Sequence, residues 1–280
     1  MKLSIVIPVY NEARALDACL QSIADQLDAP FEVIVVDNNS SDSSVSVASN
    51  YAFVRVLKEN QQGVTHARNT GFNAASGEII GRIDADTILP NDWTIKIMSI
   101  FNNSPDVAAV SGSPDYYDFA LSNTANTIDY YLRNYLSKKL GNTNFLWGAN
   151  MAIRRSAWRK VRSALCNEKY MHEDFDLAIH LQEQEHKVLY ESSIIAGVSS
   201  RRIDTNFRSY LTYCKMSPRT YALHNLRSRV YMYPILVVCV SLYLPARLIY
   251  RGYDHEKGGF SVNKLFMNTQ PRIDPTSNIV

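Results

Sequence analysis

Short apolar runs alternate with amphipathic stretches along the first part of the chain. The runs at residues 3–10, 31–36, 53–57 and 78–83 have the length and composition of buried strands. Between the first two, residues 13–27 place leucine and isoleucine at helical spacing. Strands that alternate with helices in this way predict βαβ units and a mostly parallel sheet. We therefore expect an α/β fold with a ligand crevice above the strand ends.

Two carboxylates follow the fourth apolar run. Asp84 and Asp86 come directly after it, and the chain then turns at Pro90. Residues i and i+2 of an extended strand point to the same side, so both side chains should project together. Like charges this close repel unless a cation lies between them, and a hard divalent cation prefers oxygen ligands. Two aspartates alone are explained equally well by a solvated turn.

Another acidic cluster opens a predicted helix near residue 173. Asp174 lies three residues before Leu177 and shares its inward face. The helix dipole favours an acid in the first turn, which is the structural explanation of Asp174. It does not account for three acids, Glu173, Asp174 and Asp176, at a strongly packed helix start.

Composition and motifs limit the class of protein and its cellular compartment only in part. The 280 residues are 46% hydrophobic and 20% charged, which suits one large globular domain with an appendage, and the net charge of +2 carries no signature. The motifs G-x-G-x-x-G after the first strand and G-x-x-x-x-G-K-S/T are absent from the sequence, which argues against dinucleotide and P-loop sites. The four cysteines are scattered without zinc-type spacing, and no signal peptide is visible, so we expect a reducing, cytoplasmic setting.

The last third of the chain is first basic and then apolar. Residues 201–229 carry six arginines and one lysine against the single acid Asp204. Such a basic segment suits nucleic acid, anionic lipid, a phosphorylated substrate or simply a solvated helix face. Residues 230–246 are uncharged and mostly apolar, but shorter than the roughly 20 residues of a spanning helix. We expect this run to dock on a membrane surface. The alternatives are a short span and a helix buried against the catalytic domain or a homodimer partner. Residues 268–280 are expected to form a flexible tail.

Taken together, segments in all but the last part of the chain resemble the family 2 glycosyltransferases with a GT-A fold. The matching segments follow the family's order, at residues 7–12, 35–42, 67–78, 84–86, 148–155 and 173–177. The resemblance implies an α/β/α sandwich with a mixed, mostly parallel sheet. Its catalytic domain would cover residues 1–203, with nucleotide binding in 1–112 and the acceptor part in 113–203, followed by a helical, membrane-associating segment at 204–267.

The resemblance also implies a reaction, the transfer of a sugar from a nucleoside diphosphate sugar to an acceptor hydroxyl. Asp37 resembles the family's contact to the base, which favours UDP over GDP. Asp86, with Asp84, would hold Mn²⁺ or Mg²⁺. The residues matching the family's nucleotide contacts are Pro8, Tyr10, Glu12, Asp37, Asn39, Arg68, Asp84 and Ala85.

Asp174 matches the family's general base, which implies inversion at the anomeric carbon. Donor sugar and acceptor would meet at a set of residues from the later segments, namely Trp147, Gly148, Asn150, Glu173 and Arg202. Many relatives place a histidine or arginine near position 202 against the diphosphate. This chain has arginines there, which leaves a third protein ligand to the metal open.

The expected partners are a nucleotide sugar, a carbohydrate or lipid-linked acceptor and the inner face of the cell membrane, but not nucleic acid. Two rival functions remain. A sugar nucleotidyltransferase would need a glycine-rich basic loop after the first strand, which the chain lacks at residues 10–13. A catalytically silent sugar-binding or scaffold protein would be expected to lose acids, yet Asp37, Asp84, Asp86 and Asp174 are all present.

Overall fold

The computed structural model describes residues 1–141, 145–254 and 259–265, and the predicted tail at 268–280 lies outside them. The strands are β1 (Leu3–Val9), β2 (Glu32–Asp37), β3 (Val54–Lys58), β4 (Ile79–Arg82), β5 (Val107–Tyr116), β6 (Met151–Arg154), β7 (Lys187–Val198), β8 (Tyr253–Asp254) and β9 (Gly259–Phe260). The helices are α1 (Ala13–Ala24), α2 (Ser44–Ser49), α3 (Val64–Ala74), α4 (Trp93–Asn103), α5 (Ser122–Lys139), α6 (Arg155–Val161), α7 (Glu173–Glu183), α8 (Phe207–Leu223), α9 (Met232–Gly252) and α10 (Val262–Leu265), with short 3₁₀ turns η1 (Arg201–Asp204) and η2 (Arg227–Tyr231).

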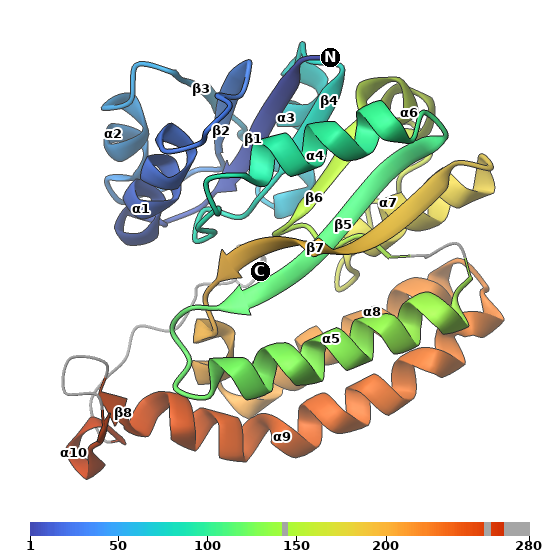
Figure 1. The fold of residues 1–280 in the computed structure, drawn as a ribbon. Helices are drawn as coiled ribbons and strands as arrows, with labels where there is room; N and C mark the ends of the chain where they lie inside the picture. The colour runs from blue at the N-terminus through green and yellow to red at the C-terminus, as the bar shows by residue number, and fades with distance from the viewer. Residues whose placement is uncertain (142–144, 255–258, 266–280) are drawn as a thin grey trace.

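A seven-stranded sheet in the order β3-β2-β1-β4-β6-β5-β7 forms the centre of the molecule (Figure 1). β6 runs antiparallel to β4 and β5, and the other neighbouring strands of this sheet run parallel. The predicted mixed, mostly parallel sheet is therefore confirmed. Because β1, β2 and β4 are parallel neighbours, their carboxyl ends meet at one edge.

Side chains alternate between the two faces of the sheet and build a core on each. In β1, Ile5 and Ile7 pack on the side covered by α1, α2 and α4, while Val6 packs on the side covered by α3, α6 and α7. Figure 1 shows α4 crossing in front of the sheet and α3 and α7 behind it. This arrangement is the expected α/β/α sandwich.

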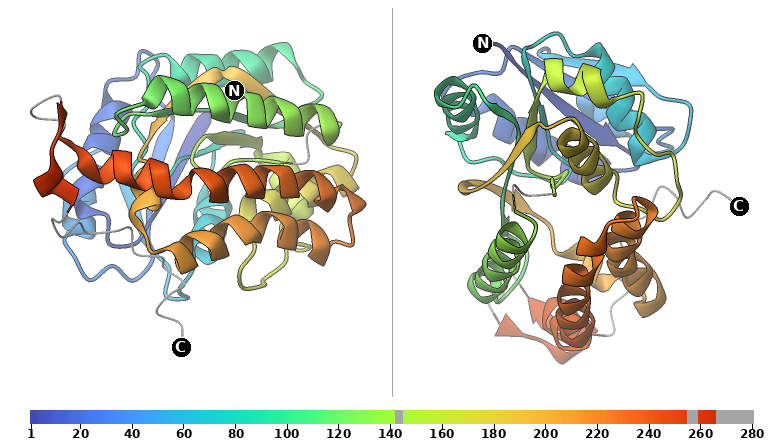
Figure 2. Two further views of the ribbon diagram at one scale, coloured as in Figure 1. Left: turned by 90° about the horizontal axis from the view of Figure 1, so that it is seen from below. Right: turned by 90° about the vertical axis from the view of Figure 1, so that its right-hand side faces the viewer.

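A layer of helices lies beside this sandwich. The polar, tyrosine-rich sequence of residues 115–140 predicts an irregular stretch followed by a helix. The 18-residue helix α5 is present, but residues 115 and 116 complete β5. Leu136 of α5, Ile179 of α7, Tyr221 of α8 and Met232 of α9 share one apolar core. Seen from below, α9 crosses the outer face between α5 and α8 (Figure 2). The packing thus crosses the predicted boundary at residue 203.

Helix α9 leaves most of its apolar surface uncovered. Among the described residues, Arg227–Gly252 is long and apolar enough to cross a membrane, with a mean hydropathy of 1.8 and only 11% of the residues in that window buried. Few residues of α9 are fully buried, and the membrane surface, the short span and the packed helix all stay predictions.

Candidate active site

The loops after β1 and β2 lock together at the carboxyl edge of the sheet. Asn11 adopts the left-handed conformation (φ 53°), and its Oδ1 accepts a hydrogen bond from the Ser41 amide at 2.8 Å. The Asn11 amide donates to Ser40 Oγ at 3.0 Å, and the Glu12 amide donates to Ser44 Oγ at 2.9 Å. These bonds fix the rim on which Tyr10 and Glu12 lie.

The polar residues after β2 divide between the crevice and the supporting loop. Asp37 is 6% exposed, and its Oδ1 accepts from the Ser40 amide at 3.2 Å. Asn39 (φ 65°) donates from Nδ2 to the carbonyl oxygen of Asn60 at 2.9 Å. Asp37 therefore lies where a base contact was predicted, whereas the Asn39 amide is engaged with the neighbouring loop. Both nucleotide contacts stay predictions.

The two aspartates after β4 are arranged differently from the extended geometry expected of them. β4 ends at Arg82, and the Thr87 amide donates to the Asp84 carbonyl oxygen at 3.0 Å, so the chain turns at Asp84. The carboxylates face different cations. Asp84 Oδ1 lies 3.1 Å from Arg82 Nη2, and Asp86 Oδ2 accepts from Arg201 Nη2 at 2.8 Å and Nε at 3.0 Å. The i, i+2 argument was wrong here because the strand had already ended.

Arg201 joins two strand ends that are distant in the sequence. Besides Asp86, its Nη2 contacts Glu12 Oε1 at 2.6 Å. The side-chain atoms that could bind a metal here are carboxylate oxygens, which are the ligands that a hard divalent cation such as Mn²⁺ or Mg²⁺ prefers. Asp84 and Asp86 would hold such a cation, and Arg201 would then share or give up its place at Asp86.

A buried arginine, Arg82, connects these acids to the start of α7. Its Nη1 lies 2.6 Å from Glu173 Oε1, as an ion pair rather than an aligned hydrogen bond. A Cβ atom at Gly148 would overlap the Arg82 guanidinium, so only glycine leaves room for it. Sequence analysis missed Arg82. Its signal was a charged residue inside the apolar run that ends at Ile83.

Asp174 is held by two backbone donors beside this ion pair. It is 7% exposed, and its carboxylate accepts from the Gly148 amide at 2.8 Å and the Phe175 amide at 2.9 Å. Burial and the charge of Glu173 raise the pKa of Asp174 to about 7, against the opposing effects of Arg82 and the two amides. Burial also acts to raise the pKa of Glu173, but Arg82 and Arg68 outweigh it and hold that pKa below its usual value. Of the pair, Asp174 is the carboxyl suited to exchange a proton near neutral pH.

Arg68 lies behind this cluster rather than in open space. Its side chain is fully buried, with Nη1 donating to the Glu173 carbonyl oxygen at 2.8 Å and Nε donating to Asn69 Oδ1 at 3.0 Å. In this structure Arg68 supports the start of α7. Its predicted contact with ribose or diphosphate is not visible here and stays a prediction.

Asn150, expected at the meeting point of donor and acceptor, is a core residue. It is fully buried, with Nδ2 donating to the carbonyl oxygens of Ser113 and Ile194 and Oδ1 accepting from Trp93 Nε1 at 2.9 Å. These bonds join β5, β7 and α4 beneath the site. Asn150 thus positions the loop that carries Gly148.

Trp147 and Arg202 both take part in cation–π contacts. The Arg133 guanidinium lies 4.3 Å from the half-buried Trp147 ring, and the Arg202 guanidinium lies 3.9 Å from the ring of Tyr213. The ion pairs with Glu12 and Asp86 come from Arg201, the neighbour of the residue that the sequence favoured. A role for Trp147 and Arg202 toward a bound sugar stays a prediction.

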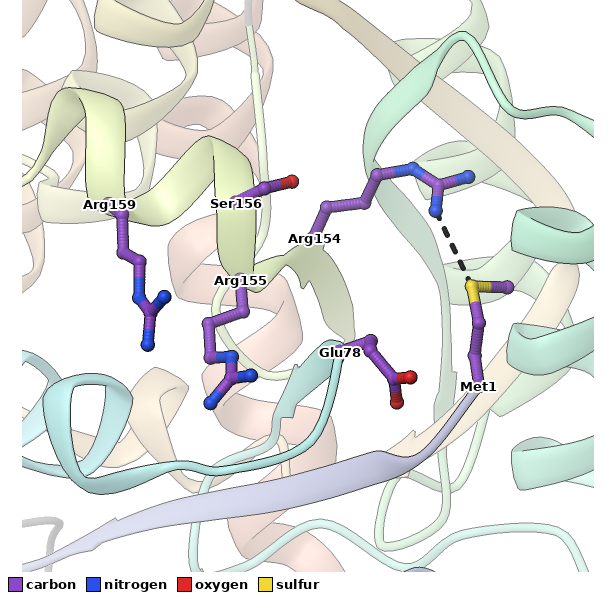
Figure 3. A pocket seen from close by; sticks show the side chains of 6 residues that line it. All are labelled: Met1, Glu78, Arg154, Arg155, Ser156 and Arg159. Carbon is purple, nitrogen blue, oxygen red and sulfur yellow. Dashed lines mark hydrogen bonds between the residues drawn. The ribbon is translucent and has the colours of Figure 1, made fainter.

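A cavity of about 300 Å³ lies elsewhere (Figure 3). It is lined by residues at the amino ends of β1 and β4 and at the start of α6, namely Met1, Glu78, Arg154, Arg155, Ser156 and Arg159. The amino ends of parallel strands are opposite the edge that carries Asp37 and Asp84. This cavity is therefore not part of the site.

Comparison with known proteins agrees with this geometry. The sequence model described as Glycosyl transferase family 2 matches residues 4–162, more than half of the chain. The chain belongs to glycosyl transferase family 2. The predicted family resemblance is thereby confirmed, and the matched range includes Asp37, Asp84, Asp86 and Gly148 but ends before Asp174.

Curated relatives within the family share part of their length with this chain. Glycosyltransferase AglE of Haloferax volcanii is 27% identical over 165 residues, which is 56% of this chain and 54% of the relative. Undecaprenyl-phosphate 4-deoxy-4-formamido-L-arabinose transferase of Serratia proteamaculans is 28% identical over 149 residues, 50% of this chain and 46% of the relative. The chain thus spans about half the length of these relatives.

Solved structures show the same GT-A fold. The mannosyltransferase PcManGT of Pyrobaculum calidifontis, in complex with GDP-Man and Mn²⁺, superimposes with a TM-score of 0.68 at 20% identity, covering 88% of this chain and 74% of its own. Glucosyl-3-phosphoglycerate synthase of Mycobacterium tuberculosis, in complex with Mn²⁺, UDP-Glc and phosphoglyceric acid, superimposes with a TM-score of 0.55 at 18% identity, covering 78% and 79%. At these identities the likeness establishes the fold.

Proposed function

We propose that this chain is an inverting glycosyltransferase that transfers a sugar from a nucleoside diphosphate sugar to an acceptor hydroxyl. The observation that carries the proposal is the link from Asp84 through Arg82 to Glu173, next to Asp174. It joins the predicted donor site at the strand ends to a buried carboxyl at the start of α7. The silent scaffold does not explain why these acids are gathered and buried at one edge of the sheet.

Asp174 acts as the general base on the acceptor hydroxyl. The Gly148 and Phe175 amides fix the orientation of its carboxylate, and Arg82 holds the neighbouring Glu173 as its ion-pair partner. A positioned carboxylate that accepts the hydroxyl proton raises the nucleophilicity of the attacking oxygen as the bond to the sugar forms. Attack from the side opposite the departing diphosphate inverts the anomeric carbon.

The donor nucleotide lies along the carboxyl ends of β1, β2 and β4. Asp37 accepts hydrogen bonds from the base, which favours a UDP-sugar, while Tyr10 and Glu12 line the rim. Asp84 and Asp86 hold a divalent cation, which when bound supplies positive charge to the diphosphate. Two neighbours of this fold form complexes with Mn²⁺, which supports Mn²⁺ or Mg²⁺ here. Arg201 places a further positive charge beside Asp86.

The acceptor is a carbohydrate or lipid-linked molecule at the inner face of the cell membrane. The exposed apolar face of α9 and the exposed cations around it, such as Arg227 and Arg229, support this placement. Apolar burial combined with attraction to anionic lipid favours a helix that lies in the interface. One of the relatives is an undecaprenyl-phosphate sugar transferase, which is consistent with a lipid-linked acceptor.

The base assignment is tested by Asp174→Asn. Asparagine keeps the shape of the side chain but cannot take up the proton, so transfer should fall by about 10²–10⁴-fold while binding of the donor nucleotide stays near normal. The measurements are release of the nucleoside diphosphate from UDP- and GDP-sugars in the presence of membrane lipid extract, and calorimetric binding of the nucleotide. Asp92→Asn, at an exposed ion pair with Lys96, is the matched control. Full turnover by Asp174→Asn would exclude Asp174 as the base.

A further inference from the structure

Four side chains with metal-binding atoms converge on the far side of α7 from the proposed active site. Asp176 and His180 lie one turn apart on α7, Cys166 lies in the loop before it, and His224 ends α8. Their ligand atoms all lie within 4.8 Å of one another. Cys166, Asp176 and His180 lie within 15 residues of one another, whereas His224 comes from the end of α8 and is brought to them by the fold.

The spacing of these atoms is close to that of a tetrahedral zinc site. His224 Nε2 lies 2.8 Å and His180 Nε2 lies 3.5 Å from Asp176 Oδ1, and Cys166 Sγ lies 3.9 Å from each of the two Nε2 atoms. Zinc bonds of about 2.0–2.3 Å in a tetrahedron place neighbouring ligand atoms about 3.3–3.7 Å apart. The ligand atoms all lie within 4.8 Å of one another, so side-chain shifts of up to about 1 Å would surround an ion.

Groups outside the cluster orient its members. His180 Nδ1 lies 2.7 Å from Glu183 Oε2, so this nitrogen is engaged with a carboxylate and Nε2 is directed to the cluster. Glu183 Oε1 also lies 3.9 Å from Nδ1 of His224. The second oxygen of Asp176 accepts from the Cys166 amide at 3.1 Å, which leaves Oδ1 for the centre. A carboxylate behind a ligating histidine is a common feature of zinc sites.

We propose that Cys166, Asp176, His180 and His224 bind one structural zinc ion. Thiolate and imidazole ligands in a closed four-coordinate set select a borderline-soft ion such as Zn²⁺. This distinguishes the site from the oxygen-only pair Asp84 and Asp86. The proposal does not depend on the proposed transferase activity.

The ion would connect α7, whose first turn carries Asp174, to the loop that precedes it and to the end of α8, which is distant in the sequence. Zinc binding would in this way fix the proposed base relative to the helical layer. The sequence showed no paired cysteine spacing of the kind that holds zinc, and this arrangement, with a single cysteine, does not use such spacing.

Cobalt titration of the full chain, after removal of bound metal, tests the site directly. Co²⁺ in a tetrahedral site with one thiolate gives a sulfur-to-cobalt charge-transfer band in the near ultraviolet and strong visible bands. We expect both bands to saturate at one equivalent and to disappear when Zn²⁺ is added. Cys166→Ser should lose the charge-transfer band, while Cys239→Ser on α9 should keep it. A wild-type chain without the band, or a Cys166→Ser chain that retains it, would overturn the proposal.

Thermal unfolding gives a second, independent readout. An ion that binds only the folded chain raises its stability in proportion to the logarithm of the metal concentration. The unfolding temperature should therefore rise when Zn²⁺ is added to the metal-free wild type, but much less for His224→Gln. His186→Gln, which replaces a histidine outside the cluster, should respond as the wild type does. If Zn²⁺ does not change the unfolding temperature of the metal-free wild type, the proposal is overturned and the four side chains form only a hydrogen-bonded cluster.

Discussion

Gly148 and Arg82 connect the acids after β4 with the acids at the start of α7. The Arg82 guanidinium occupies the space where any side chain at Gly148 would begin, and it pairs there with Asp84 and Glu173. The Gly148 amide at the same time donates to Asp174. One glycine thus permits the ion pairs and also orients the proposed base.

Gly148→Ala should therefore impair activity. The new methyl group would displace Arg82, and a displacement of about 1 Å at a site of this kind can lower the rate about 100-fold. Sugar-nucleotide turnover is the measurement, with Gly259→Ala as control, because a Cβ atom there meets nothing within 4 Å. Turnover equal to wild type in Gly148→Ala would show that the Arg82 arrangement is not needed for catalysis.

At the residue scale, the sequence predicted the acids better than it predicted their partners. Asp84, Asp86 and Asp174 could be found because they follow recognisable runs and match family segments. Arg82 and Arg201 could not be chosen, since pairing them with these acids depends on how β4, η1 and α7 meet in space. Asn150 looked like a site residue because it lies in a matching segment, yet its side-chain amide makes hydrogen bonds only to core groups of β5, β7 and α4 among the bonds observed.

At the scale of elements, Glu32 at the start of β2 fastens the amino edge of the sheet. Its Oε1 accepts from Ser4 Oγ at 2.6 Å and from the Ser76 amide and hydroxyl at 2.6 and 2.7 Å. Ser4 Oγ in turn accepts from the Gly77 amide at 2.9 Å. One carboxylate thereby links β1, β2 and the turn that leads into β4.

Glu32→Gln should lower the free energy of unfolding by about 1 kcal/mol at pH 7, since the charge-assisted bonds are only partly shielded from water. Burial acts to raise the pKa of Glu32, but the donors of Ser4 and Ser76 outweigh it and hold that pKa below 4.5. A lowered pKa means that the stabilisation is present above about pH 4.5 and is lost as the pH falls through the folded-state value.

The difference between wild type and variant should accordingly shrink in acid. Urea unfolding of both chains at pH 7 and at pH 3.5 measures it. Glu191→Gln, a partly exposed acid on β7, serves as control. A difference that is absent at pH 7, or that grows as the pH falls, would contradict the role given to Glu32.

The ends of strands and helices could be predicted where apolar periodicity was strong. The prediction failed where a single turn determined the end of an element. The strands β1 to β4 and the helix α1 lie close to their predicted ranges. β4 was predicted to run on toward Asp84, but the Thr87 amide closes a turn at Asp84 and directs the two aspartates to different arginines. The polar, tyrosine-rich residues 115–140 were expected to be irregular and then helical. The helix is present as α5, but the first residues of this segment, 115 and 116, continue β5.

At the scale of the whole molecule, α9 presents exposed apolar side chains on the helical layer that it forms with α5 and α8 (Figure 2). Val237, Leu244 and Leu248 of α9 are each more than half exposed, at 62%, 62% and 52%. Cations at both ends of the helix, including Arg229 and Arg251, flank this surface. Such an arrangement suits attachment parallel to a membrane containing anionic lipid.

Replacing both Val237 and Leu244 by Asp should shift the chain from vesicles to solution. Two negative charges on the exposed apolar face that would enter the membrane oppose insertion and repel anionic lipid. Flotation with vesicles of anionic and of neutral phospholipid measures the shift. Ser99→Asp, at an exposed polar position on α4 away from α9, is the control. A wild-type chain that does not float with anionic vesicles would contradict membrane attachment, and sedimentation of the same samples would test the predicted homodimer.

The central claim is that the carboxyl edge of the sheet binds a sugar-nucleotide donor with the help of a divalent cation. Calorimetric titration of UDP and of GDP into zinc-loaded chain, each with and without added Mn²⁺, tests it most directly; omitting a chelator leaves the proposed zinc ion in place. We predict that one nucleotide, UDP in preference to GDP, binds only when Mn²⁺ is present. The Asp86→Ala chain should lose this Mn²⁺-dependent binding. Absence of binding by both nucleotides in the presence of Mn²⁺ would contradict the account.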